Sequence, residues 1–149
     1  MPLSVRQVVK WKANMWGRQG LGIAFAMLAV SFTAAAQQSA RPSVVLKELV
    51  EGMPKGDRQE VQVLTAGFTP GQSTVFHTHR FPVTVYVLEG AFTLEMEERA
   101  PVTITAGQSF VEPPNVRMTG HNHSATAPLR VVIFYVGDPG TPFLDMIHN

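Results

Sequence analysis

The stretch GQSTVFHTHRFPVTVYVLEG, residues 71–90, decides the fold. It places His77 and His79 one residue apart within a run rich in β-branched and aromatic residues. Such residues favour extended strands, whose side chains alternate between the two faces of a sheet. The two imidazoles are therefore expected on one face, with Val75 as their apolar wall. Neutral imidazoles arranged in this way can bind one metal ion, or can form a hydrogen-bonded pair inside a barrel mouth.

The same alternation predicts which residues after the histidines face the interior. Val83, Val85 and Val87 share one parity and are expected to line an interior pocket, which suits an apolar ligand. Tyr86 and Leu88 have the opposite parity and are expected to pack outside. Together with Phe76, which is also expected to point outward, they could form a patch through which a homodimer assembles.

The flanking sequence predicts many short strands separated by turn residues, and the chain's 12 glycines and 11 prolines suit such a β protein. After Gln37 no segment shows a sustained helical period. Strands at spacings of about 8–12 residues indicate a sandwich or barrel. Beyond the loop at 138–142, the apolar pair Phe143 and Leu144 is expected to dock back. The expected strands are 44–50, 61–66, 75–79, 83–88, 92–97, 102–105, 109–112, 116–120 and 129–136.

Two segments resemble the paired motifs of the cupin superfamily. The first motif, G-x5-H-x-H-x3,4-E-x6-G, and the second, G-x5-P-x-G-x2-H-x3-N, occur here in the same order. The resemblance covers roughly residues 47–136, which are most of the chain after residue 36, and implies an all-β fold, a small double-stranded β-helix or jelly-roll barrel. The matching residues are Gly71, His77, His79, Gly90, Gly107, Pro113 and Asn122.

Three positions depart from these motifs. Val83 stands where the first motif has its glutamate, and Met118 stands where the second motif has its histidine. Asn115 replaces the central glycine of the second motif, although asparagine tolerates a left-handed turn. The set of three histidines and one glutamate that the resemblance implies is thus reduced to His77 and His79. Another carboxylate could complete it, and the sequence leaves three candidates open: Glu95, Glu97 and Glu112.

The identity of the metal is also open among Fe, Mn, Zn and Cu. Met118 is either a flexible core residue or, beside His77 and His79, a soft thioether ligand that would favour Cu(I). In the second case, Met118→Leu should weaken Cu(I) binding. His121 and His123 have the opposite strand parity to Met118 and are expected outside the barrel unless a bulge near Gly120 reverses them.

Residues 1–36 are expected to be a secretory signal peptide rather than part of the fold. Four basic residues precede an apolar run at 21–32, and cleavage is expected after Ala36. A retained membrane anchor is the alternative. Residues 37–149, a single expected domain, keep 8 of the 12 basic residues and all 11 acidic ones, a net charge of −3. This charge argues against nucleic acid or an anionic membrane as partner, and export predicts a periplasmic or secreted protein.

The resemblance implies a metal-dependent dioxygenase, isomerase or lyase that acts on a small organic molecule, with His77 and His79 holding the metal. The loss of the glutamate at Val83 favours a different class, a barrel that binds a small ligand without catalysis. A barrel that serves mainly for self-association is a third possibility. The absence of cysteine excludes disulfides and thiolate metal sites.

Overall fold

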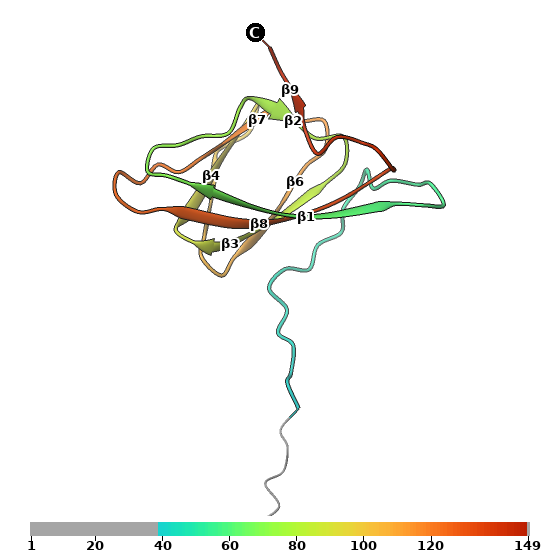
Figure 1. The fold of residues 1–149 in the computed structure, drawn as a ribbon, viewed down its shortest axis with the longest axis horizontal. Helices are drawn as coiled ribbons and strands as arrows, with labels where there is room; N and C mark the ends of the chain where they lie inside the picture. The colour runs from blue at the N-terminus through green and yellow to red at the C-terminus, as the bar shows by residue number, and fades with distance from the viewer. Residues whose placement is uncertain (1–38, 149) are drawn as a thin grey trace, which may run out of the picture. The chain divides into compact units, whose positions relative to one another are not determined.

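The computed structural model describes residues 39–148, which contain strands and no helix (Figure 1). The expected signal peptide at 1–36 lies outside the described residues. No helix within 39–148 has the length and apolarity to cross a membrane. The strands are β1 (Glu60–Phe68), β2 (His77–Thr78), β3 (Val83–Glu89), β4 (Ala91–Met96), β5 (Val102–Thr105), β6 (Ser109–Glu112), β7 (Met118–His121), β8 (Leu129–Gly137) and β9 (Asp145–Met146).

The strands form two antiparallel sheets that face each other across the core (Figure 1). One sheet has the order β1-β8-β3-β6 and the other the order β5-β4-β7-β2-β9. Neighbours within each sheet are mostly distant in sequence, as in a jelly roll. The all-β prediction is therefore confirmed, and most expected strands lie within a few residues of the observed ones.

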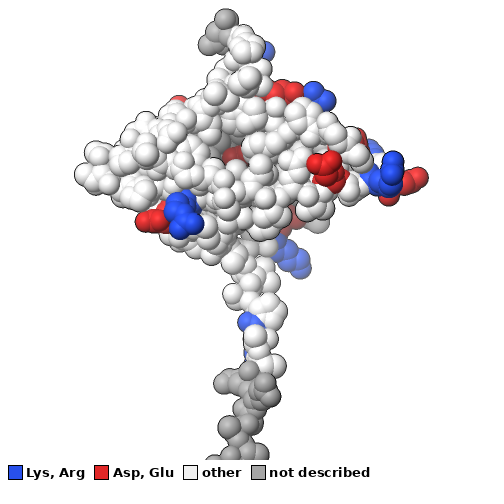
Figure 2. All heavy atoms as spheres, in the orientation of Figure 1, with Lys and Arg blue, Asp and Glu red and all other residues white. Residues whose placement is uncertain are grey.

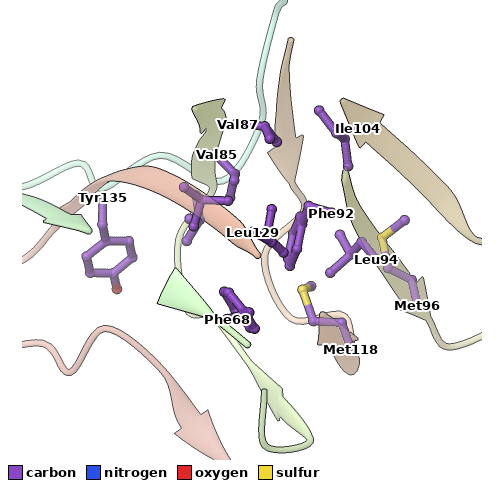
Figure 3. Packing of buried hydrophobic residues seen from close by; sticks show 12 residues of the cluster. Phe68, Val85, Val87, Phe92, Leu94, Met96, Ile104, Met118, Leu129 and Tyr135 are labelled. Carbon is purple, nitrogen blue, oxygen red and sulfur yellow. The ribbon is translucent and has the colours of Figure 1, made fainter. Parts of the chain in front are cut away.

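The interior is filled by the strand positions that the alternation predicts. On β3, Val83, Val85 and Val87 are buried, whereas Leu88 is exposed and Tyr86 only partly covered. Figure 3 shows Leu94 and Leu129 packed with aromatic and methionine side chains from both sheets. Burying such an aliphatic side chain stabilises the fold by about 1.5–3 kcal/mol, so these inward positions hold the two sheets together.

Two expectations about strands are wrong. Residues 44–50 form no strand, and Val44 and Leu49 are 79% and 100% exposed. Their β-branched composition is not sufficient, because a strand also needs a hydrogen-bonded neighbour. The expected strand 75–79 is reduced to His77–Thr78. Val75 precedes this short strand and is 52% exposed, so it does not form the apolar wall beside the histidines.

The outward residues Phe76, Tyr86 and Leu88 do not form one patch. Phe76 directly precedes β2 in the five-stranded sheet, whereas Tyr86 and Leu88 lie on β3 in the four-stranded sheet. Outward side chains of two facing sheets point to opposite sides of the molecule. Self-association of the chain stays a prediction, without this patch as its basis.

Two asparagines shape the loops near the interior. Asn115 adopts a left-handed φ of 59°, as expected for a replacement of the motif glycine. Its N–H donates to the carbonyl of His79 at 2.7 Å, which ties the β6–β7 loop to the end of β2. The buried Asn122 side chain donates to the carbonyls of Thr69 and Ala127 and accepts from the Ser124 N–H. Both asparagines therefore connect their loops to segments that are distant in the sequence.

Gly120→Ala is expected to destabilise the protein by about 1–3 kcal/mol, the usual cost of overpacking a core. Gly120 lies on β7, and a Cβ there would overlap two ring carbons of the buried Phe92. Gly67→Ala on β1 is the matched control, because its Cβ would meet no atom within 4 Å. Urea denaturation should show a lower midpoint for the first variant only. An equal midpoint in both variants would contradict this packing.

Candidate functional site

A cavity of about 120 Å³ lies between the two sheets, and both predicted metal-binding histidines line it. Val85 lines it as expected, while Val83 and Val87 are buried in the core without lining it. Figure 2 shows a hollow in a face that carries few charges around it, with acidic atoms at the bottom. The cavity is lined by Ala66, Phe68, Thr74, His77, His79, Val85, Phe92, Glu112, Val131, Ile133, Phe143 and Leu144.

His77 and His79 project into this cavity together. Their Nε2 atoms lie 3.1 Å apart, and their rings meet edge to face at 78°. Both side chains are buried. Two nitrogen ligands of one metal ion with bonds of about 2.0–2.1 Å lie about 2.9–3.4 Å apart in octahedral or tetrahedral geometry. The spacing of the two nitrogens therefore suits a shared ion.

The opposite ring nitrogens fix the tautomer of both histidines. His77 Nδ1 lies 2.7 Å from the carbonyl oxygen of Val75, and His79 Nδ1 lies 2.7 Å from that of Phe143. A carbonyl oxygen can only accept a hydrogen bond, so each Nδ1 must carry the hydrogen. In the neutral rings, each Nε2 then presents a lone pair to the cavity. Backbone carbonyls orient metal-binding histidines in the same way.

Glu112 is the carboxylate that reaches the histidines. It is the last residue of β6, it is buried, and its Oε2 lies 3.1 Å from His79 Nε2. Its strand neighbour across the sheet is Val83. Paired residues project from the same face, so Glu112 places a carboxylate beside the position of the missing glutamate.

These three groups bring three hydrogen-bond acceptors into contact. With both Nδ1 atoms protonated and Glu112 ionised, the two Nε2 atoms and Oε2 are all acceptors in contact. Buried acceptors without a donor are costly. A bound cation would satisfy all three acceptors at once, and the donor set of two imidazoles and one carboxylate fits a metal ion.

The three groups form a row with His79 in the middle. Within residues 39–148, His79 is the histidine of this row that contacts the Glu112 carboxylate. No ion pair joins His77 to Glu112 in this part of the chain. Nor do three or more histidine or acidic side chains of this region converge as a ready ligand set. Burial is the main cause that lowers the pKa of His77, which limits competition by protons at its Nε2. Glu112 would have to turn toward His77 to complete a three-ligand set.

The C-terminal segment closes one side of the cavity. Phe143 and Leu144 line it, as expected of an apolar pair that docks back, and the Phe143 ring packs against His79 at 4.9 Å between centroids. Strand β9 then pairs with β2, so that the Ile147 N–H donates to the Phe76 carbonyl. The segment thus supplies both a wall of the cavity and the acceptor that orients His79.

An exposed ion pair fastens this segment. Arg80 donates two hydrogen bonds to Asp145, at 2.8 and 2.9 Å, and these bonds hold the pKa of Asp145 below its ordinary value. A lowered carboxyl pKa contributes stability above the ordinary value near pH 4, and this contribution is lost as the pH falls through the lower folded pKa. The segment should therefore loosen in acid.

Asp145→Asn is expected to reduce the hydrogen-exchange protection of the Ile147 N–H several-fold, because the charged pair is lost. Acidification below about pH 4 should reduce this protection in the unmodified protein and much less in the variant. Glu97→Gln, which removes an exposed ion pair to Arg117, is the control. Equal protection in Asp145→Asn and the unmodified protein would show that the pair does not fasten the segment.

The family of this fold follows from the sequence match. The family model for the cupin domain matches residues 64–135, from β1 to the end of β8. Residues 64–135 are a cupin domain. No curated protein sequence matches it.

Solved structures agree with this cupin fold. A cupin-like protein from Thermotoga maritima superposes with a TM-score of 0.51 at 20% identity, over 60% of this chain and 65% of its own. A double-stranded β-helix protein from Klebsiella pneumoniae gives 0.51 at 17% identity, over 74% and 100%. A DMSP lyase from Ruegeria pomeroyi gives 0.50 at 17% identity, over 58% and 42%. The match spans less than two thirds of the Thermotoga and Ruegeria proteins, and these identities show the fold alone.

The other two candidate carboxylates of this cupin domain lie away from the cavity. Glu95 lies 3.5 Å from His121 Nε2 and 3.7 Å from His123 Nε2, and these two imidazole rings stack at 4.9 Å. Glu97 faces Arg117. None of these residues lines the cavity, so His121 and His123 lie outside as expected. The structure thus selects Glu112 among the three carboxylates.

Met118, at the position of the missing cupin histidine, lies in the apolar core. It is fully buried and pairs with His77 across β2 and β7, but it does not line the cavity. Figure 3 shows it close to Leu94 and Met96. Its surroundings suit a core methionine, and the thioether ligand stays a prediction.

Little in the sequence points to the remaining parts of the site. Phe68 and Phe92 line the cavity from opposite sheets, and the Phe143 carbonyl orients His79 from 64 residues away in the chain. Backbone acceptors carry no sequence signature. The partners of His79 therefore become visible only in the folded chain.

Proposed function

We propose that this protein is an exported cupin that binds one divalent metal ion through His77, His79 and Glu112. The ion would face the apolar cavity, where a small organic molecule binds. Support for the metal comes from one observation, the contact among three acceptor atoms that share no hydrogen. Export is supported by the basic leader and apolar run of residues 1–36.

The donor set narrows the choice of metal. Two histidines and one carboxylate with open positions are typical of Fe(II), and Mn(II) and Zn(II) accept the same donor types. When bound, such an ion supplies a Lewis acid that polarises an oxygen of the ligand. The chain's own residues orient the two imidazoles through the carbonyls of Val75 and Phe143 and exclude water with aromatic walls. This arrangement supports an enzyme of the dioxygenase, isomerase or lyase type.

A cavity that binds a small molecule without a metal is the second candidate. Its support is the lining, in which apolar side chains outnumber the polar ones. In this case, a proton shared within the row of His77, His79 and Glu112 would supply the positive charge.

Metal content after loading separates the two candidates. The full chain is incubated with Fe(II), Mn(II), Zn(II) or Cu(I), dialysed, and measured by elemental analysis. We expect one equivalent of at least one divalent ion per chain. Less than a tenth of an equivalent under every condition would favour the metal-free cavity. Tight binding of Cu(I) that Met118→Leu weakens would assign the soft ligand set instead.

A further inference from the structure

The cavity lining points to the class of molecule that binds beside the proposed metal. The geometry points to a small uncharged ligand of about six non-hydrogen atoms, with one oxygen group at the histidines and an apolar body. This inference rests on the proposed function, because the oxygen group would meet the metal held by His77, His79 and Glu112.

The volume of the cavity limits the size of the ligand. The cavity volume is about 120 Å³, whereas an engineered apolar cavity of about 150 Å³ holds benzene. Ordinary ligand pockets are about 300–1,000 Å³. Phe68, Phe92 and Phe143 limit the space with rings from both sheets and from the C-terminal segment. A ligand much larger than a five-membered ring would have to displace one of them.

The residues that line the cavity disfavour a charged group on the body of the ligand. The residues that line the cavity include no lysine or arginine, and Glu112 is their only carboxylate. The one other polar side chain besides the histidines, Thr74, already accepts a hydrogen bond from the Gly120 N–H at 2.9 Å. A charged group on the body of the ligand would lose water without gaining a partner, which is costly. The surface around the hollow in Figure 2 likewise carries few charged residues.

Three probes of six non-hydrogen atoms test the charge: cyclopentanol, cyclopentylammonium and isobutyrate. Binding to the full chain is measured by ligand-observed NMR titration, first without metal and then after loading. We expect cyclopentanol to bind at least tenfold more tightly than isobutyrate to the metal-free protein, because its three acceptor atoms repel an anion. In the loaded protein, where the metal supplies the positive charge, we expect cyclopentanol to bind at least tenfold more tightly than cyclopentylammonium. Equal or tighter binding of the ion in either comparison, or no saturable binding of cyclopentanol, would overturn the inference.

Two variants test the location. Ala66→Leu should reduce cyclopentanol binding at least tenfold by filling the cavity, whereas Val63→Leu, on the same strand but 60% exposed, should not. Ile133→Ala should enlarge the cavity and admit cyclohexylmethanol, so the inference stays testable if Ala66→Leu fails to fold. If neither inward variant changes the binding of the probes, they bind elsewhere and the inference is wrong.

The outcomes for ligand and metal are independent. Preferential binding of cyclopentanol by a chain that takes up no metal would refute the proposed metal site and leave the ligand class standing. Uptake of one metal ion without selectivity for the uncharged probe would support the proposed metal site and refute the ligand class.

Discussion

Replacing both His77 and His79 by alanine is expected to abolish stoichiometric metal binding, with a loss of affinity greater than about 100-fold. Loss of an outer-shell partner alone costs about 10–100-fold, and this variant removes two ligands. Both rings are buried, and their Nε2 atoms lie 3.1 Å apart. No other histidine lines the cavity, so no neighbouring imidazole can replace them there. Isothermal titration with the metal that the unmodified protein retains would measure the loss.

The chain contains a matched control for this variant. His121 and His123 have the same one-residue spacing, lie near Glu95, and are outside the cavity. Replacing both by alanine should leave the affinity unchanged within a factor of about two, since the outer pair is not part of the proposed site. If this outer variant lost the metal and the inner variant retained it, the metal site would have been assigned to the wrong pair.

Glu112→Val is expected to lower metal affinity at least about 100-fold, because it removes the only carboxylate in the cavity lining. A carboxylate neutralises part of the charge of a divalent ion, which two imidazoles cannot do. Glu95→Val is the control, since Glu95 lies with the outer histidines. Circular dichroism would confirm that both variants keep the β fold.

The double variant Val83→Glu/Glu112→Val carries this prediction further. Val83 and Glu112 are paired across β3 and β6, so the exchange moves the carboxylate to the neighbouring strand on the same face. It also restores the glutamate of the first cupin motif. We expect at least a tenfold recovery of affinity over Glu112→Val. A double variant no better than Glu112→Val would show that the carboxylate does not act as a ligand in the paired positions.

Strand alternation is the part of the fold that sequence predicts well. The buried Val83, Val85 and Val87 and the converging His77 and His79 follow from a period of two. Alternation fails where the backbone leaves the sheet, as at Val75 and in residues 44–50. A local pattern states which face a residue would occupy in a strand, but it does not supply the strand's neighbour.

The carboxylate shows what local pattern cannot provide. Glu112 is one of three acidic candidates in the sequence, and its selection depends on the pairing of β3 with β6, two strands separated in the chain by β4 and β5. The Phe143 carbonyl that orients His79 likewise lies in a segment for which the sequence predicts no strand. Contacts set by strand register and by backbone atoms need the folded chain.

Anomalous diffraction from crystals grown with the retained metal would show whether His77, His79 and Glu112 bind it. We expect one strong peak about 2.0–2.2 Å from the Nε2 atoms of His77 and His79, with an oxygen of Glu112 turned toward it. A metal-soaked crystal with no peak in the cavity, or with its only peak beside His121 and His123, would contradict this metal site.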